Sequence, residues 1–321
     1  TVGLGPAANS AFAISTMLIA VPTGVKIFNW IGTLWGGSIR INTSLLFSVG
    51  FIAMFVIGGL SGITHASPPS DAQQQDTYYI VAHFHYVLFG GSILGLFSGI
   101  YYWWPKMTGR LLNEKLGIYH WILTMIGFNV TFFPMHWLGM DGMPRRIFTY
   151  PEGMGWDMSN LIATVGSFTI AVGVLVFIIN VLYSNRGSKN AGNDPWDART
   201  LEWTISSPPP HYNFAQIPEV KYRDDFWYQK YPEPSHGSVS GLASESYKEE
   251  NHNDHHDIHM PDMSYYPVFL SLGIALILGS LLDLSWIGSW VIVGIGIVIF
   301  IWSFLGWSFE PVNEEKNSKK G

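Results

Sequence analysis

The feature that most constrains this chain is a series of apolar runs, each long enough to cross a lipid bilayer. A transmembrane helix needs about 20 mostly apolar residues, and a helix satisfies its own backbone hydrogen bonds in lipid. Hydrophobic residues make up 48% of the 321 positions and charged residues only 12%, which is more apolar than a soluble domain of this size needs to be. We therefore expect an all-α, polytopic helix bundle with seven spans, at 8–33, 43–65, 77–104, 116–137, 156–183, 267–282 and 287–304.

Basic residues in the connections indicate how the spans are oriented. One arginine follows the first span, three basic residues lie within 106–115, seven lie between the fifth and sixth spans, and three follow the seventh. We expect these connections and the C-terminus to be cytoplasmic and Thr1 to lie outside, in a bacterial plasma membrane. Arg145 and Arg146 are exceptions, because they fall in a connection on the opposite side.

Composition divides the chain into four parts and limits its chemistry. We expect a five-span core at 1–185, a long polar cytoplasmic segment at 186–265, a two-span extension at 266–307 and a polar tail at 308–321. The sequence contains no cysteine, so any metal must be held by nitrogen or oxygen ligands. The net charge of −6 comes mainly from the polar segment, and we expect no nucleic-acid partner.

The polar segment contains a second group of histidines. A transition metal could bind there, although an acidic, histidine-rich run is more often simply solvated. The four histidines are His252, His255, His256 and His259.

The run from Asp76 to Tyr86 places His83 and His85 inside the third apolar span. On an α-helix, residues i and i+2 are separated by about 200°, so the two side chains leave the helix on opposite sides. They cannot chelate one metal ion together, but each could serve a different ligand pocket. Alternatively, each histidine is a core residue that is hydrogen-bonded to a neighbour. Two histidines in one span, flanked by Tyr and Phe, favour the ligand interpretation.

The whole run resembles the tenth transmembrane helix of subunit I of the haem–copper terminal oxidases, the respiratory enzymes that reduce oxygen to water. The resemblance implies that His83 is the axial ligand of the high-spin haem at the oxygen site, that His85 ligates the low-spin haem, and that Phe84 lies between the two haems. Haem A is the expected type. The chain resembles the C-terminal half of subunit I of caa3- or aa3-type oxidases, so the copper ligands of the oxygen site would lie in the missing N-terminal half.

The first span combines polar groups that are costly in lipid. Lys26 is ionisable, Thr16 and Thr23 add hydroxyls on the same side, and Pro22 removes a backbone hydrogen bond. These groups suit a chain of waters that carries protons, whereas a lysine near a helix end can also snorkel to the interface. The run from Pro22 to Lys26 resembles the family's lysine-containing proton channel, which favours the channel.

Two connections on the outer side carry charged residues with a match in the family. The resemblance places Asp71 and the pair Arg145 and Arg146 near haem propionates, which guanidinium groups can bind in a bidentate way. It also places Asp76 at a magnesium site. Gln75 stands where the family often has histidine, which puts that site in doubt.

We therefore interpret the chain as part of subunit I of a cytochrome c oxidase that reduces oxygen with electrons from cytochrome c and translocates protons. Its partners would be the N-terminal half of subunit I, subunits II and III, cytochrome c and the lipid bilayer. A quinol oxidase of the same superfamily is the closest alternative, and Asp76 counts against it because quinol-oxidising relatives tend to have asparagine there. A non-catalytic multi-spanning membrane protein is the alternative from another class.

Overall fold

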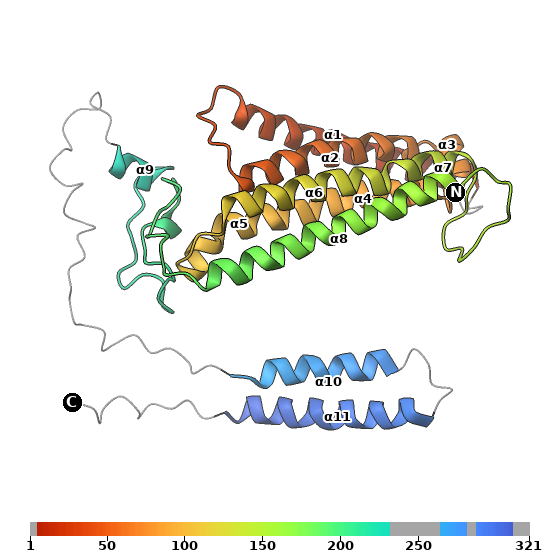
Figure 1. Cartoon of the computed structure of the whole chain (residues 1–321). Coiled ribbons are helices and arrows are strands. Elements are labelled where there is room, and N and C mark those ends of the chain that lie inside the picture. Colours follow the sequence, from red (N-terminus) through yellow and green to blue (C-terminus); the bar gives the residue numbers. More distant parts are fainter. Residues whose placement is uncertain (1–4, 232–263, 281–286, 311–321) are drawn as a thin grey trace, which may run out of the picture. The chain divides into compact units, whose positions relative to one another are not determined.

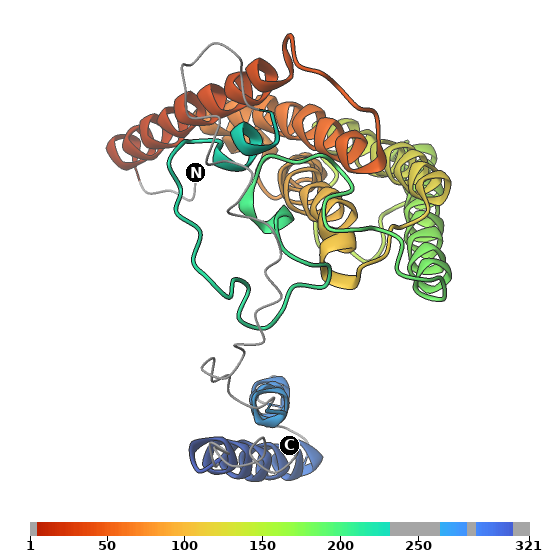
Figure 2. The ribbon, with the colours of Figure 1, turned by 90° about the vertical axis from the view of Figure 1, so that its left-hand side faces the viewer.

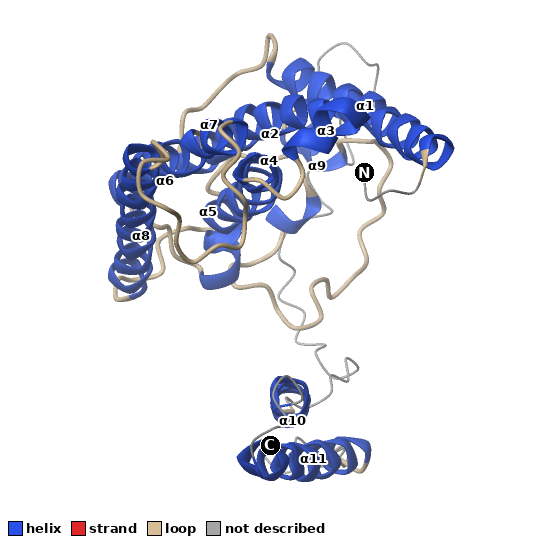
Figure 3. Cartoon of the chain, turned by 90° about the vertical axis from the view of Figure 1, so that its right-hand side faces the viewer, coloured by secondary structure: helices blue, strands red, loops and turns tan. Residues whose placement is uncertain are grey.

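The computed structural model describes residues 5–231, 264–280 and 287–310, and these form helices and connecting loops (Figure 1). No strand occurs among the described residues (Figure 3), although Thr77 and Pro144 form an isolated antiparallel bridge. The chain divides into two compact units, which we describe separately. The first contains the helices up to Lys230, and the second contains the two C-terminal helices.

The first unit is built on five long apolar stretches, which confirms the all-α, polytopic prediction. Its helices, in chain order, are α1 (Pro6–Leu34), α2 (Thr43–Ala66), α3 (Pro68–Gln74), α4 (Tyr78–Leu88), a π-helical turn (Phe89–Ile93), α5 (Leu94–Thr108), α6 (Glu114–Phe132), α7 (Pro134–Met140), α8 (Asp157–Asn185), a 3₁₀ turn (Leu201–Trp203) and α9 (Asp225–Lys230). The stretch from α4 to α5 is long and apolar enough to cross a membrane as one helix, and so is the stretch from α6 to α7.

Short polar side chains set the starts of these helices. Asn42 accepts a hydrogen bond from the Leu45 N–H at 2.9 Å, and Asn113 accepts one from the Leu116 N–H at 3.1 Å. Thr77 caps α4 through the Tyr79 N–H at 3.2 Å. Such caps satisfy backbone donors that have no partner within the helix, so they locate each helix along the chain.

The core of the first unit lies where α2, α4, α5 and α6 meet. Phe47, Tyr86, Leu94 and Phe128 are fully buried there. Gly58 of α2 allows a close approach to α4, because a Cβ at this position would lie 3.0 Å from the Tyr86 carbonyl carbon. Small residues at such crossings let membrane helices pack closely, and this contact fixes α2 beside the face of α4 that carries His83.

Successive connections lie at alternate ends of the bundle, as the predicted spans require. At one end, Arg40 donates to the Trp196 carbonyl and Arg110 donates to the Gly187 carbonyl, so the first and third connections meet the segment after α8. Figure 2 looks onto this end, where the segment after α8 (green to teal) passes over the helix ends. At the other end, Arg145 pairs with Asp76, so the second and fourth connections meet there.

The second unit is a pair of antiparallel helices, α10 (Tyr266–Ser280) and α11 (Ile287–Ser308). α11 is long and apolar enough to cross a membrane, whereas α10 has 15 residues and spans only about 22 Å at 1.5 Å per residue. The described residues thus contain six candidate spans and one shorter apolar helix, where the sequence predicted seven spans. The predicted sixth span ended at Leu282, and its last two positions lie outside the described residues.

Candidate functional site

His83 and His85 leave α4 toward different neighbouring helices. The His83 ring packs against α2, where a Cβ on Gly62 would lie 3.1 Å from its Cε1 atom. The His85 ring stacks on Phe132 of α6, with ring centres 4.0 Å apart and planes 15° apart. The two imidazoles therefore face separate environments, as residues i and i+2 of a helix must.

Each of these histidines is held through Nδ1 by a backbone carbonyl. Nδ1 of His83 lies 3.0 Å from the Gly58 oxygen and 2.8 Å from the Ser61 hydroxyl, which itself donates to Gly58. Nδ1 of His85 lies 2.8 Å from the Val81 oxygen. Because a carbonyl oxygen can only accept, Nδ1 carries the proton in both rings and Nε2 keeps its lone pair.

This arrangement fits axial ligation of haem iron. Metal-binding histidines typically donate their other ring N–H to a carbonyl or carboxylate, which fixes the tautomer and the ring orientation. Nε2 of His83 and Nε2 of His85 accept no hydrogen bond from any described residue. The donor set thus suits two separate haems. Phe84, the residue between them, contacts the His85 ring at 4.5 Å.

The second and fourth connections carry the predicted carboxylates and arginines, and these side chains have different partners. Arg145 binds Asp76 through Nη2 at 2.5 Å and Nε at 2.8 Å, while its backbone N–H donates to the Asp76 carbonyl. Arg146 has a positive φ of 65° and forms no ion pair with the described residues. Asp71 lies in α3, with its carboxylate 3.8 Å from Nδ1 of His65.

A magnesium site is not formed by these side chains alone. Within residues 5–231, 264–280 and 287–310, no three His, Asp or Glu side chains are placed to hold a metal ion. Asp76 is instead engaged by Arg145. The predicted histidine run at 252–259 lies outside the described residues.

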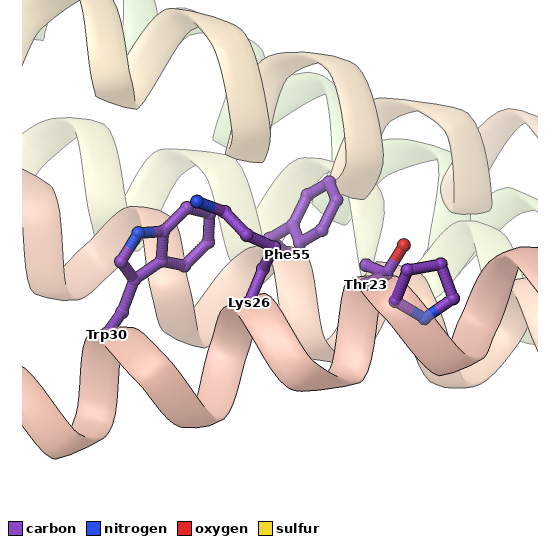
Figure 4. Close-up of a pocket in the computed structure, with 5 residues that line it drawn as sticks. Thr23, Lys26, Trp30 and Phe55 are labelled. Atoms are coloured by element: carbon purple, nitrogen blue, oxygen red, sulfur yellow. The ribbon is translucent and has the colours of Figure 1, made fainter.

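Lys26 lines an open pocket of about 310 Å³ between α1 and α2 (Figure 4). Its side chain runs along α1, and Nζ lies 5.3 Å from the centre of the Trp30 ring. Thr23 lines the same pocket and donates its hydroxyl to the Ile19 carbonyl at 2.8 Å. Thr16 lies two turns earlier on the same side of α1 and does not line the pocket. Pro22 and Phe55 complete the lining.

Sequence reasoning missed two buried histidines. His65 lies at the end of α2, and both of its ring nitrogens are buried without a hydrogen-bond partner among the described residues. His120 of α6 is fully buried, with Nδ1 3.2 Å from the Tyr101 hydroxyl. Both lie within apolar spans, where an ionisable residue is expensive and therefore a functional candidate, so the signal was present in the sequence.

Comparisons with known proteins found subunits of bacterial oxidases that are similar to this chain. Cytochrome c oxidase subunit 1 of Bacillus subtilis (strain 168) is 44% identical over 301 residues, which cover 92% of this chain and 46% of that protein. The corresponding protein of Thermostichus vulcanus is 54% identical over 220 residues, which cover 68% of this chain and 40% of that protein. Quinol oxidase subunit 1 of Bacillus subtilis is 42% identical over 308 residues, which cover 95% of this chain and 46% of that protein.

A solved structure supports the fold alone. A chain from a cryo-EM structure of a heme-copper terminal oxidase dimer superposes with a TM-score of 0.50 at 19% identity, covering 59% of this chain and 39% of that chain. The chain spans about half the length of the curated relatives it matches. The model of the family described as cytochrome c and quinol oxidase polypeptide I matches residues 1–169. This chain therefore belongs to the cytochrome c and quinol oxidase polypeptide I family.

Proposed function

We propose that this chain forms the C-terminal half of subunit I of a cytochrome c oxidase, which reduces oxygen to water and translocates protons. The observation that carries the proposal is the pair of histidines on opposite sides of α4, each with Nδ1 bonded to a backbone carbonyl. One axial ligand for each of two haems on a single helix requires the two imidazoles to leave on opposite sides, and a metal-binding histidine typically donates its other ring N–H to a carbonyl.

In this proposal, His83 would hold the iron of the high-spin haem and His85 the iron of the low-spin haem. When bound, two haems of the A type and a copper ion supply electron transfer and oxygen reduction. The copper would be held by the part of subunit I that this chain does not match. The chain itself would orient both imidazoles through Gly58 and Val81 and keep Phe84 between the two sites.

The outer end of the bundle would bind the haem propionates. Arg146 forms no ion pair with the described residues and is available to a carboxylate, while Arg145 is held beside it by Asp76. Asp71 lies at the same end, in α3. A magnesium ion at Asp76 would have to share that carboxylate with Arg145.

Lys26 would deliver protons through the pocket between α1 and α2. An amine on an apolar helix, with the Thr23 hydroxyl one turn away and that of Thr16 further along, can pass protons through ordered waters. The pocket has room for several waters, because one water occupies about 30 Å³ of liquid volume. The five-span bundle would pack against the N-terminal half of subunit I and against subunits II and III.

Cytochrome c is the proposed electron donor. The relatives include both cytochrome c oxidases and quinol oxidases at similar identity, so overall similarity does not choose between donors. Asp76 favours cytochrome c, because quinol-oxidising members of the family tend to have asparagine at this position. We further propose a bacterial plasma membrane, with the N-terminus outside and the C-terminus in the cytoplasm.

The visible spectrum of the purified complex tests the proposal. Two bound haems give separate high-spin and low-spin signals, and only the high-spin haem binds carbon monoxide. A preparation that contains this chain intact but shows no haem absorption would instead support a non-catalytic membrane protein, in which both histidines are core residues.

A further inference from the structure

His65 is a buried imidazole that lacks a hydrogen-bond partner. Its side chain is 10% exposed, and both ring nitrogens are buried with no partner among the described residues. An unsatisfied buried polar group destabilises the fold, and a neutral imidazole always carries one N–H that can donate. This cost indicates that the site is built for an acceptor from outside the described chain.

The neighbours of His65 surround the ring without bonding to it. The His83 ring meets it edge to face, with centres 4.9 Å apart, and the Tyr79 ring meets it at 5.2 Å. The Asp71 carboxylate is 3.8 Å from Nδ1, which is too long for a hydrogen bond. His136 also contacts Tyr79, with ring centres 5.1 Å apart, and its own Nδ1 is bonded to the Phe133 carbonyl.

The position of His65 along α2 relates it to the site on His83. Ser61, which contacts Nδ1 of His83, precedes His65 by four residues and therefore lies one helical turn before it on the same face. His65 is thus one turn closer to the end of α2, where α3 and the pair Arg145 and Asp76 lie. In the other direction, α2 contributes Met54 and Phe47 to the hydrophobic core.

We propose that the ring N–H of His65 donates a hydrogen bond to a propionate carboxylate of the haem whose iron His83 would hold. This inference rests on the proposed function. A haem is largely apolar except at its two propionates, so a haem anchored on His83 places them toward the polar end of the bundle, on the side of His65. A carboxylate oxygen is the strongest acceptor that the haem can offer to a buried imidazole.

The hydrogen bond has a consequence that can be measured apart from turnover. Donation to a propionate withdraws negative charge from the haem edge, which disfavours the ferric state relative to the ferrous state. Loss of the donor should therefore lower the midpoint potential of the high-spin haem and leave the low-spin haem, which is held on the opposite side of α4, unchanged.

Spectroelectrochemical titration of the complete purified complex tests the inference, with His65→Leu, His65→Asn and His65→Gln compared with wild type. Asn places an amide donor near Nδ1 and Gln places one near Nε2. We expect the ferrous-to-ferric ratio of the high-spin haem at a fixed potential to fall about tenfold in His65→Leu, which is 59 mV for a one-electron couple. One amide variant should keep this ratio within twofold of wild type. His136→Leu is the matched control and should leave both potentials unchanged.

Three results would overturn the inference. These are an unchanged high-spin potential in His65→Leu, an equal shift of both haems, or the same shift in the Leu, Asn and Gln variants, which would indicate altered packing. If His65→Leu does not retain the high-spin haem, the amide variants alone decide. One of them must then keep the ferrous-to-ferric ratio of the high-spin haem within twofold of wild type. Absence of haem from the wild type and from His136→Leu would instead contradict the proposed function.

Discussion

At the scale of single residues, the ligand roles proposed for His83 and His85 can be tested separately, because each histidine would bind a different haem. In the assembled complex, His85→Ala should remove the narrow visible band of the low-spin haem, because the axial ligand is lost, while carbon monoxide still binds the high-spin haem. His83→Ala should have the reverse effect. Reduced-minus-oxidised and carbon monoxide difference spectra measure both signals. Ligand loss also removes binding free energy from the folded state, so only protein that keeps its remaining haem should be compared.

A third histidine provides the control for these two variants. His136 lies near the same cluster, but its Nδ1 is bonded to the Phe133 carbonyl and its ring faces Tyr79. His136→Ala should leave both haem signals in place. The same spectral loss in His83→Ala and His85→Ala would show that the two histidines do not serve separate haems.

Lys26 should matter for turnover and not for haem binding. Lys26→Met keeps a similar stem but deletes the ionisable group in the pocket, so proton delivery should slow and oxygen consumption should fall at least roughly tenfold. The measurement is turnover with haem content determined on the same sample. Lys115→Met, at an exposed position, is the control. Turnover within twofold of wild type would exclude the channel role, whereas loss of haem would indicate a structural lysine.

The individual site residues show which features of the site could be predicted from the sequence and which could not. The opposite directions of His83 and His85 follow from helical periodicity alone, because that spacing is local. The pairing of Arg145 with Asp76 joins positions 69 apart, and the neighbours of His65, which lies on α2, come from α3 and α4. Such contacts depend on how helices pack, which no local pattern encodes.

At the scale of elements, the first five spans could be placed from hydropathy, because lipid requires long apolar helices. The interruptions within these spans could not be placed from hydropathy. The π-helical turn at Phe89–Ile93 includes Gly90, which packs closely against α2, because a Cβ there would lie 2.9 Å from Met54. The segment after α8 reads as a loop from its polar composition, yet residues 191–206 contain buried side chains such as Trp203.

Lys106 should hold that segment against the end of α5. Its side chain is buried, and Nζ donates to the carbonyls of Asn193 at 3.1 Å and Ile205 at 2.7 Å. Lys106→Met should weaken the attachment by about 1.5–3 kcal/mol, the contribution of hydrogen bonds to a charged group. Hydrogen exchange of residues 193–206 should then speed up, with Lys221→Met as the exposed control. Unchanged exchange would mean that packing of Trp203 alone holds the segment.

The segment after α8 should also respond to pH through Lys230 and Asp197. The hydrogen bond from Lys230 holds the pKa of Asp197 below its ordinary value. Desolvation lowers the pKa of Lys230, but its hydrogen bonds to Asp194 and Asp197 outweigh this and raise that pKa above its ordinary value.

A depressed carboxyl pKa gives stability that is lost as pH falls through the folded value, and a raised lysine pKa gives stability that is lost as pH rises through the folded value. Exchange at residues 194–198 should therefore be slowest between about pH 5 and pH 9 after correction for intrinsic exchange. In Lys230→Met, protection should be weaker across this window and should no longer fall at high pH. An identical pH profile in the variant would contradict this role.

At the scale of the whole molecule, the connections of the first unit fall into two groups, one at each end of the bundle. Contacts of Arg40 and Arg110 with the segment after α8 unite one set, and the pair of Arg145 with Asp76 unites the other. Lysines and arginines are concentrated in the first set, which favours the cytoplasmic side for it. The structure gives the grouping of the connections, and the charge bias gives the proposed direction across the membrane.

Single cysteines can test that direction, because the native chain contains none. Phe148 is fully exposed in the connection between α7 and α8, and the Lys221 side chain is 62% exposed in the segment after α8. In intact cells, a membrane-impermeant maleimide should label Phe148→Cys and spare Lys221→Cys, and permeabilisation should expose both. The unmodified complex gives the background from partner subunits. The reverse pattern would invert the proposed orientation, because the two connections lie at opposite ends of the bundle and cannot exchange sides without carrying charged loops through the lipid.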